Sequence, residues 1–474
     1  MTQSRVTETQ SRTPLVDETD WRAPETLVAA LPTAPGTVFL DSAMSHPELG
    51  RWSYLAFDPF GHFMVRDGQA IWNGELLAEA PIEALRLQLR RYAVAREPEM
   101  PSYLPGATGA FSYEAGALFE RLPPPRATGP AAPEIELWFH DAALVFDRAE
   151  QRLFIVSTGW PETERVKQAN RREARATWLR DWLRNAGDAA PHPHVRLPRD
   201  AWRSNLGRRG YEKAVSRTRA YILAGDVFQA NIAQRFSTML PVGWDAIGLY
   251  DQLRIANPAT FGAFVAGADQ TLLSMSPERF LRLRDGQVET RPIKGTRGRS
   301  TDQAEDRRLA DELIASAKDR AENVMIVDLL RNDLSRVSKP GTVNVPMLCG
   351  LESYAAVHHL VSVVTSQLHD GADALDLLAA CFPGGSVTGA PKIRAMEIIH
   401  ELEPDRRGVY CGSIAHLGFD GSLESNIAIR TLVCAGREAS FHAGGGITLL
   451  SDPAAEYEET LIKAERVFAA FEAG

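Results

Sequence analysis

Short stretches in which apolar and polar residues alternate recur in the first third of the chain, separated by turn residues. A period of two residues predicts β-strands. Residues 106–116 mix small and aromatic side chains, as in a strand that lies close to another backbone. The predicted strands are residues 37–42, 50–57, 106–116, 137–146 and 153–157, and the predicted helices are residues 82–93 and 162–186.

Apolar residues recur at helical spacing in several stretches of the second half. The longest stretch covers residues 302–337, and Pro340 helps to end it. Strand patterns lie between these helices without regular alternation. The predicted helices are residues 209–224, 302–337, 372–382, 391–402 and 454–473, and the predicted strands are residues 272–275, 287–291, 409–419, 425–433 and 439–442.

Two segments without periodicity divide the chain. Residues 1–20 are polar and predict a mobile N-terminal segment, and residues 186–208, rich in Ala, Pro, His and Arg, predict a linker. An N-terminal subdomain of residues 21–185 and a C-terminal domain of residues 209–474 lie on either side of it. A chain of 474 residues is long enough for two or three domains, or for one large intergrown unit.

Composition narrows the class of protein. The hydrophobic fraction of 44% and the charged fraction of 24% are typical of a soluble globular protein. A net charge of -9 argues against a nucleic-acid-binding protein. The sequence shows neither a secretory signal nor a run of about 20 apolar residues, so no membrane partner is expected. Its four widely spaced cysteines fit neither a zinc site nor a disulfide framework, which predicts a cytoplasmic protein.

Lys294 lies in the stretch Pro292–Thr296, directly after a predicted strand. The proline of this stretch fixes its own φ and the glycine permits angles closed to other residues, which predicts a turn that holds the lysine tightly. A lysine in a turn is most often a solvated cation. It acts as a nucleophile only when burial or a neighbouring cation lowers its pKa, and Arg291 and Arg297 are candidates for that cation.

Four carboxylates form two pairs at i, i+3 on predicted helices. Asp319 and Glu322 share one helical face, and Glu456 and Glu459 share a face of the final helix. Two such pairs facing each other would supply the oxygen ligands that Mg²⁺ prefers. Cations stand near each pair, so solvated helix faces are the alternative interpretation.

Two glycine-rich stretches are candidates for backbone contact with a ligand. Residues 382–392 precede a helix, where backbone N–H groups hold anions, and the absence of Walker spacing favours a carboxylate over a phosphate. Gly444–Gly446 is the second stretch, although a tight turn explains either one equally well. Arg430 alternates with apolar neighbours in a predicted strand and is a candidate partner for a carboxylate.

The combination and order of motifs resemble the chorismate-utilising enzymes, which include the anthranilate, aminodeoxychorismate, isochorismate and salicylate synthases. The resemblance is nearly continuous from residue 209 onward and looser before it, where LDS at Leu40 and GRWSYLAFDP at Gly50 carry it. The motifs are SPERF from Ser276, PIKGTR from Pro292, KDRAENVMIVDLLRNDL from Lys318, VHHLVS from Val357, GGSVTGAPKIRAM from Gly384, YCGS from Tyr410, AIRT from Ala428, AGGGI from Ala443 and EYEET from Glu456.

This resemblance implies a fold and a branch of the family. The implied fold is an anthranilate-synthase-like α+β unit of two large packed antiparallel sheets with outer helices, and the non-alternating pattern agrees with it. Anthranilate synthases are similar here but carry alanine at the position of Lys294, so the lysine indicates the aminodeoxychorismate synthase branch. In that branch the lysine adds to C2 of chorismate, and ammonia then adds at C4 to give 4-amino-4-deoxychorismate for para-aminobenzoate and folate synthesis.

The resemblance also implies residue roles. Gly298 and Ala415–His416 depart from the commoner family residues, which puts the edge of the site in doubt. The implied catalytic residues are Lys294, the acid/base Glu278 and His359; the implied Mg²⁺ ligands are Glu322 and Glu459, with Asp319 and Glu456 beside them; and the implied substrate contacts are Ser386, Tyr410, Arg430, Gly444, Gly446 and Lys463.

The expected partners follow from the same resemblance. Chorismate is the expected substrate, and a separate glutamine amidotransferase subunit is expected to deliver ammonia, because no cysteine has the glycine-framed turn of a glutaminase nucleophile. The N-terminal half is similar to a tryptophan-binding sandwich, which makes tryptophan a candidate ligand. Anthranilate synthase and, from another class, a non-catalytic tryptophan-binding regulatory subunit are the alternatives; the intact carboxylates and Lys294 argue against the regulatory subunit.

Overall fold

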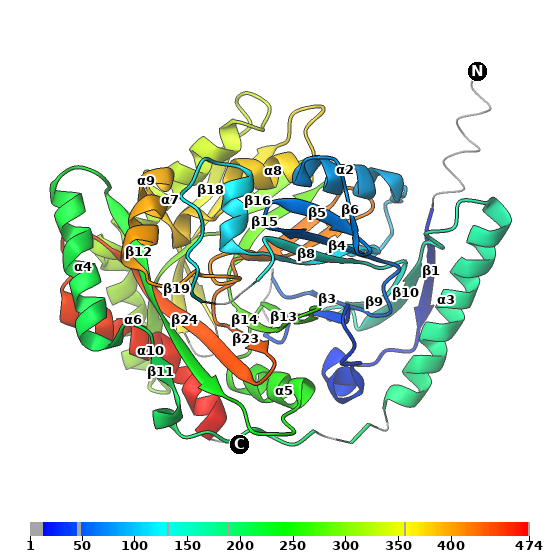
Figure 1. Ribbon diagram of the computed structural model, residues 1–474, viewed down its shortest axis with the longest axis horizontal. Coiled ribbons are helices and arrows are strands. Elements are labelled where there is room, and N and C mark those ends of the chain that lie inside the picture. Colours follow the sequence, from blue (N-terminus) through cyan, green and yellow to red (C-terminus); the bar gives the residue numbers. More distant parts are fainter. Residues whose placement is uncertain are drawn as a thin grey trace.

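Two twelve-stranded sheets form the centre of the molecule, and helices lie on their outer faces (Figure 1). The computed structural model describes residues 13–44, 49–129, 132–187, 189–190, 192–354 and 357–472. Every strand pair assigned within these residues is antiparallel. The expected α+β class with two large packed sheets is therefore confirmed.

The first sheet joins strands from both halves of the chain. Its order is β1 (Leu15–Thr19), β10 (Arg152–Ser157), β9 (Ala142–Asp147), β3 (Trp52–Ala56), β2 (Val38–Asp41), β13 (Phe261–Ala266), β14 (Thr271–Ser276), β23 (Thr431–Ala435), β24 (Glu438–Ile447), β12 (Gln229–Met239) and β11 (Arg203–Ser204), with β20 (Gly389–Ala390) beside β12.

The second sheet also joins strands from both halves of the chain. Its order is β17 (Ile293–Gly298), β19 (Val357–Gln367), β16 (Gln287–Thr290), β15 (Arg279–Arg284), β22 (Leu423–Asn426), β21 (Ser413–Gly418), β7 (Gly106–Phe111), β8 (Ile135–Phe139), β4 (Gly61–Arg66), β5 (Gln69–Trp72) and β6 (Glu75–Leu76), with β18 (Asn344–Ser353) beside β19.

Helices cover the outer faces of both sheets. Within the described residues, no helix is both long and apolar enough to cross a membrane. The α-helices are α2 (Pro81–Arg91), α3 (Arg165–Ala186), α4 (Gly207–Leu223), α5 (Ala246–Ala256), α6 (Gln303–Ala315), α7 (Ala317–Ser335), α8 (Ala374–Cys381), α9 (Lys392–Leu402) and α10 (Pro453–Glu472), and the 3₁₀ turns are η1 (Pro24–Ala30), η2 (Tyr113–Leu118), η3 (Arg199–Ala201) and η4 (Gly385–Val387).

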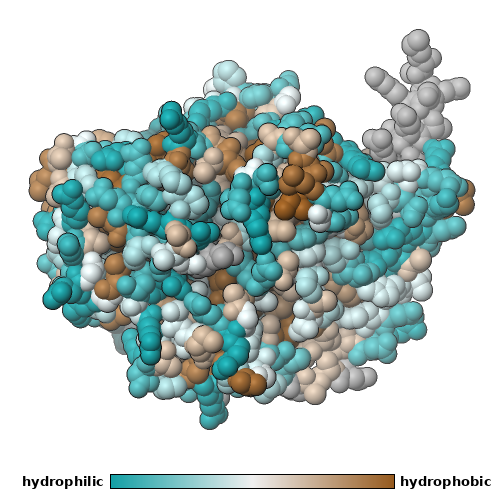
Figure 2. Space-filling model, viewed as in Figure 1, coloured by the Kyte–Doolittle hydropathy of each residue, from teal (hydrophilic) through white to brown (hydrophobic). Residues whose placement is uncertain are grey.

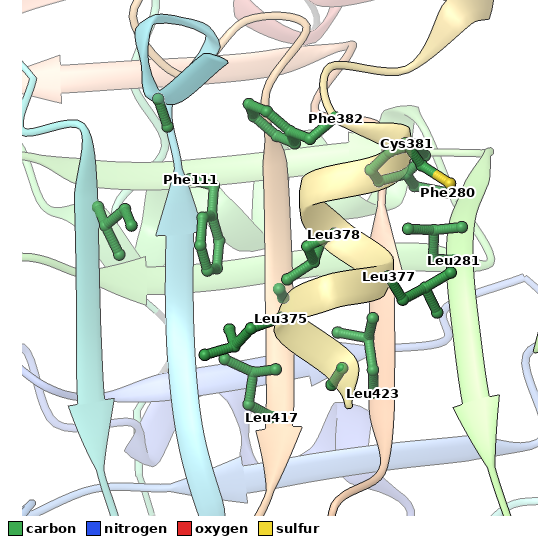
Figure 3. Close-up of a cluster of buried hydrophobic side chains, with 14 of the residues drawn as sticks. Phe111, Phe280, Leu281, Leu375, Leu377, Leu378, Cys381, Phe382, Leu417 and Leu423 are labelled. Atoms are coloured by element: carbon green, nitrogen blue, oxygen red, sulfur yellow. The ribbon is translucent and has the colours of Figure 1, made fainter. Parts of the chain in front are cut away.

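Burial of apolar side chains explains this layering. The inner faces of the two sheets meet in a cluster that includes Val38 and Val265 of the first sheet and Ile414 of the second. Outside the second sheet, Leu375 and Leu378 of α8 pack over its strands (Figure 3). Helices α3, α5 and α10 cover the first sheet. The outward face of α3 is hydrophilic and forms a largely teal strip on the right of Figure 2.

The structure corrects the prediction for the segment 1–20. Residues 15–19 form β1, an edge strand that pairs with β10, although residues 1–12 lie outside the described part. The polar residues of this strand fit an edge position, because one side of such a strand faces solvent.

Strands on either side of the segment 186–208 share both sheets. The domain boundary predicted over this segment remains a prediction. The described C-terminal end of this segment is anchored. Trp202 is 8% exposed and packs against Phe441, Phe468 and Phe471.

The prediction of one helix over 302–337 was wrong in its middle. Ser316 has an extended backbone, with φ -64° and ψ 105°, and separates α6 from α7. Its hydroxyl accepts a hydrogen bond from the N–H of Asp319 at 3.3 Å. A serine cap of this kind competes with a continuous helix, and the periodicity of apolar residues does not reveal the break.

Candidate active site

Lys294, Ser386 and Glu278 form a connected buried group. The Nζ of Lys294 donates to the backbone carbonyl of Ser386 at 2.8 Å. The hydroxyl of the same serine donates to Oε1 of Glu278 at 2.9 Å. Glu278 lies between β14 and β15, whereas Ser386 lies in the turn η4. One residue of the glycine-rich turn therefore connects the amine with the carboxyl group.

Burial pushes both groups toward their neutral forms. The side chain of Glu278 is buried, which raises its pKa to about 7 despite the opposing effects of Lys294 and the Ser386 hydrogen bond. Burial lowers the pKa of Lys294 against the opposing charges of Glu322 and Glu278. A neutral amine is a nucleophile and a protonated carboxyl group is a general acid. Burial therefore favours the nucleophilic form of Lys294 and the acid form of Glu278.

The cations proposed from the sequence are not the ones that act on Lys294. Arg291 pairs with Glu352 at 2.5 Å, and Arg297 pairs with residues of α6 and α7. The positive charge that lowers the pKa of Lys294, after burial itself, is Lys463. This lysine lies on α10, far along the sequence, so the local sequence around Lys294 could not indicate it.

Lys294 stands in strand β17 and not in the predicted turn. The strand pairs with β19, and its register shifts between Lys294 and Thr296. Gly295 occupies this bulge with φ +74°, and a Cβ there would lie 2.9 Å from the Cβ of Asp319. The expectation that Gly295 adopts an angle closed to other residues is confirmed, and it lets α7 approach the strand closely.

His359 lies opposite this bulge, in β19. Its Nδ1 is 2.8 Å from the hydroxyl oxygen of Thr296. Burial, followed by the positive charge of Arg430, lowers the pKa of His359 to about 3. The imidazole is therefore neutral, and it contacts the strand that carries Lys294.

The two predicted carboxylate pairs do face each other. Lys318 Nζ lies 4.0 Å from Glu322 on its own helix and 3.7 Å from Glu456 on α10, so it bridges the helices. Burial raises the pKa of Glu322 and of Glu456. Burial alone would also raise the pKa of Glu459, but Lys463, 2.7 Å away, brings it below its usual value. The alternative of fully solvated helix faces is wrong for Glu322 and Glu456.

The chemistry of these oxygens fits a divalent cation. Oε1 of Glu322 is buried without a hydrogen-bond partner, which is costly for a carboxylate unless a ligand satisfies it. As they stand, the described side chains bring no three carboxylate, histidine or cysteine groups to one point, and lysines lie among the carboxylates. The donor set is therefore suitable for Mg²⁺ but is not arranged around one.

Arg430 and Arg466 supply uncompensated positive charge. Arg430 has φ 49° in the loop between β22 and β23, so the single strand predicted over 425–433 was wrong. In the part of the chain that the structure describes, neither arginine has a carboxylate within ion-pairing distance. Burial and the charge of Arg466 lower the pKa of Arg430 to about 10. Two arginines close together without carboxylate partners suit an anionic ligand.

A family model described as chorismate binding enzyme matches residues 39–469. This match spans most of the chain and contains every residue of the cluster described above. The chain belongs to the chorismate-binding enzymes.

Individual relatives agree with this assignment. This chorismate-binding enzyme is 40% identical over 456 residues to aminodeoxychorismate synthase component 1 of Klebsiella aerogenes, and the alignment covers 94% of this chain and 96% of that protein. It is 41% identical over 399 residues to anthranilate synthase component 1 of Streptomyces coelicolor, covering 82% and 77%. Identity alone therefore does not separate the two branches.

A solved relative confirms the expected fold type. The structure of anthranilate synthase component I from Streptococcus pneumoniae TIGR4 aligns with a TM-score of 0.77 at 30% identity, covering 89% of this chain and 92% of that chain. This chorismate-binding enzyme therefore has the anthranilate-synthase-like fold that its sequence motifs implied.

The glycines of β24 in this chorismate-binding enzyme serve different contacts. Lys463 donates to the carbonyl of Gly444 at 2.8 Å. A Cβ on Gly446 would lie 2.3 Å from Nε2 of Gln229, and a Cβ on Gly445 would lie 3.1 Å from Glu456. Gly445, the middle glycine of the predicted stretch, is thus the glycine that leaves room at the carboxylates.

Tyr410 lies beside Arg407, with its ring centroid 5.6 Å from the guanidinium carbon. It is 5% exposed, and its ring stacks on His442 with centroids 4.9 Å apart. Burial raises the pKa of Tyr410 well above its usual value, so the hydroxyl stays protonated. Its contact with substrate remains a prediction.

Three polar residues that the sequence analysis did not single out are candidates for ligand contacts. Gln229 is fully buried, and neither atom of its amide has a hydrogen-bond partner. The side-chain oxygen of Asn231, two residues along β12, is also unpartnered. Arg466 is the third, one helical turn beyond Lys463. Two amides within the apolar strand 229–232 were the available signal.

A separate cavity of about 240 Å³ lies between the sheets. Its lining includes Ser42, Trp52, Tyr103, Arg279 and His416, but none of the residues that surround Lys294. His416 therefore lies on the wall of this separate cavity and not among the residues that surround Lys294. Its ring nitrogens meet the hydroxyl of Thr108 at 2.8 Å and the carbonyl of Leu104 at 3.0 Å.

Proposed function

We propose that this chorismate-binding enzyme converts chorismate and ammonia to 4-amino-4-deoxychorismate. Its relative from Klebsiella aerogenes is named aminodeoxychorismate synthase component 1. The observation that carries this proposal is the buried pair of Lys294 and Glu278 joined through Ser386. Lysine at this position, with its pKa lowered by burial, is the feature that an anthranilate synthase does not need.

The first step forms a covalent bond to the enzyme. The lone pair of Lys294 Nζ attacks C2 of chorismate, the ring double bonds shift, and the C4 hydroxyl departs. Glu278 transfers its proton to this hydroxyl, which leaves as water. The resulting adduct carries a C2–N bond, and Glu278 is left as a carboxylate that accepts the proton lost by the amine.

The second step releases the lysine. Ammonia attacks C4, the double bonds shift back, and the C2–N bond breaks. The leaving amine of Lys294 takes up a proton, and the nitrogen that has added to C4 loses one, so atoms and charges balance. Arg430 and Arg466 would bind the substrate carboxylates, because both lie near the cluster without carboxylate partners.

We propose Mg²⁺ as the cofactor, held by Glu322 and Glu459 with Asp319 and Glu456 beside them. Oε1 of Glu322, which is buried without a hydrogen-bond partner, supports this assignment. The cation would neutralise a substrate carboxylate that the acidic side chains otherwise repel.

Replacing Glu322 or Glu459 by glutamine is expected to weaken Mg²⁺ binding about 10- to 100-fold or more. Each change removes one charged oxygen ligand. Stability without Mg²⁺ should not fall for Glu322→Gln, because burial already disfavours the charge of this side chain. Calorimetric titration with Mg²⁺ and turnover at limiting Mg²⁺ measure the effect.

Glu458→Gln is the matched control, because this neighbour of Glu459 is exposed and pairs with Arg208. It should bind Mg²⁺ like the unchanged protein. Normal Mg²⁺ affinity in both ligand variants would instead show that the carboxylates serve only the ion pairs with Lys318 and Lys463.

The chain is expected to make product from ammonium but not from glutamine. Cys349, Cys381, Cys411 and Cys434 are all buried, and burial raises the pKa of Cys381 and Cys411 to about 12. A glutaminase thiol needs the opposite shift. The product formed with chorismate, Mg²⁺ and either nitrogen source is identified by chromatography and mass spectrometry. These measurements test the activity with ammonium and the expected lack of activity with glutamine.

The names of the relatives as component 1 imply a partner component, which we propose to be a glutamine amidotransferase that delivers ammonia. Adding such a subunit should make glutamine usable. Glutamine-dependent turnover by the purified chain alone would contradict the proposal. Anthranilate as the product would favour the sister activity, which the 41% identity to the Streptomyces coelicolor protein keeps as the second candidate.

We propose tryptophan as a ligand of the separate cavity between the sheets. Trp52, Tyr103 and Phe261 offer ring contacts there. Carboxylates and arginines in the same lining suit the charged groups of an amino acid.

A further inference from the structure

A buried ion pair lies behind the turn that carries Ser386. Arg407 is 2% exposed and Glu403 is 5% exposed. The guanidinium donates through Nε to Oε2 of Glu403 at 2.9 Å and through Nη2 to Oε1 at 2.7 Å. The same Oε1 accepts the backbone N–H of Ala233 in β12 at 2.8 Å. This bidentate pairing fixes the plane of the guanidinium.

The remaining donors of Arg407 reach two backbone carbonyls from different elements. Nη1 donates to the carbonyl of Val387 at 3.1 Å, and Nη2 donates to the carbonyl of Asn231 at 2.6 Å. Val387 ends η4 and directly follows Ser386, whereas Asn231 belongs to β12. The N–H of Asn231 in turn donates to the carbonyl of Thr388 at 2.8 Å. The guanidinium therefore ties the exit of the turn to the strand.

Aromatic rings hold the guanidinium from the sides. Its carbon lies 4.7 Å from the ring centroid of Tyr113 and 5.6 Å from that of Tyr410. Burial opposes the charge, but Glu403 raises the pKa of Arg407 well above its usual range. The group is thus permanently charged and held in one orientation.

The turn needs such support because of its sequence. Gly384 and Gly385 precede Ser386 and carry no side chain that could fix the entrance of the turn. Yet Ser386 makes both hydrogen bonds that connect Lys294 and Glu278. Small displacements of a reacting group are expensive in catalysis, about 100-fold for 1 Å.

We propose that Arg407 is a positioning residue, which holds the carbonyl and hydroxyl of Ser386 where they orient Lys294 and Glu278. This inference rests on the proposed function for its kinetic consequence, but not for its structural one. Lysine cannot replace the arginine, since a single ammonium lacks the planar fork that reaches Glu403 and both carbonyls together.

Arg407→Lys is expected to lower kcat about 10- to 100-fold and to change KM for chorismate less than about threefold. Arg175→Lys is the matched control, because Arg175 is a largely buried arginine of α3, with a side chain 11% exposed, that pairs with the buried Asp141. Both variants should lose similar stability in urea unfolding. Only the change at Arg407 should lower kcat, and equal losses of kcat in both variants would overturn the proposal.

A double-mutant cycle with Ser386→Ala separates positioning from general stability. If Arg407 acts through Ser386, the double variant should lose much less activity than the product of the two single losses. Losses that multiply would overturn the proposal. Should Arg407→Lys not fold, Arg407→Gln/Glu403→Gln removes both charges together, and the same cycle applies.

A substrate-free measurement keeps this test apart from the proposed reaction. The rate at which an amine-reactive reagent labels Lys294, followed by peptide mass spectrometry, should rise at least threefold in Arg407→Lys, because the amine loses its fixed carbonyl acceptor. An unchanged rate would overturn the inference. Failure of the unchanged protein to make the C4-amino product would contradict the proposed function alone.

Discussion

Lys294→Ala is expected to abolish the covalent adduct with chorismate and to slow formation of the C4-amino product about 100-fold or more, because an amine held in place is replaced by ammonia from solution. The pKa of Glu278 should rise further, since the charge of Lys294 is the largest effect that opposes burial. Mass spectrometry of protein trapped with chorismate should show added mass on the peptide that contains residue 294.

Lys392→Arg serves as the comparison for that experiment. Lys392 is also largely buried, but it pairs with Asp333 at 2.7 Å outside the cluster. This variant should keep the adduct on Lys294. Added mass on a peptide other than the one with residue 294 would contradict the mechanism, even if turnover fell in Lys294→Ala.

Glu278→Gln is expected to lower turnover about 10²- to 10⁴-fold while making the folded protein more stable at high pH. The pKa of Glu278 rises from 4.5 to about 7 in the folded state, so the folded protein binds this proton more tightly than the unfolded chain. Stability from this group is therefore present at low pH and is lost between about pH 4.5 and 7. Above pH 7 the loss is on the order of 3 kcal/mol.

Urea unfolding at pH 5 and pH 8 measures how the stability of Glu278→Gln depends on pH. Glu278→Gln should exceed the unchanged protein in stability at pH 8 by more than at pH 5, whereas Glu401→Gln on the surface should show no such difference. An equal effect at both pH values would contradict the raised pKa. In the unchanged protein, kcat should also fall above about pH 7 as the general acid ionises.

Most elements could be predicted because apolar periodicity records which face of each segment is buried. The exceptions have local causes. The alternation of the strand predicted over 425–433 continues through Arg430, whose positive φ breaks the strand, and periodicity does not report backbone angles. The edge strand β1 was missed because three of its five residues are polar. Sheet order was not predictable from pattern, since β2 pairs with β13 more than 200 residues away.

Site residues that belong to sequence motifs could be predicted. Lys294, Glu278 and the four carboxylates could be named from sequence, and the structure brings them together. Gln229 and Arg466 could not, because what distinguishes them is the lack of a partner after folding. The cation that acts on Lys294 was also assigned wrongly, since sequence proximity favours Arg291 and folding brings Lys463.

The interleaving of the two sheets has a consequence during synthesis. Strand β2 pairs with β13, and β7 pairs with β21, so each sheet has an open hydrogen-bonding edge while the ribosome makes more than 200 further residues. The carboxylates and cations of α10 arrive later still. A nascent chain with unpaired edges is prone to associate with others, so chaperone occupancy should persist until α10 has emerged.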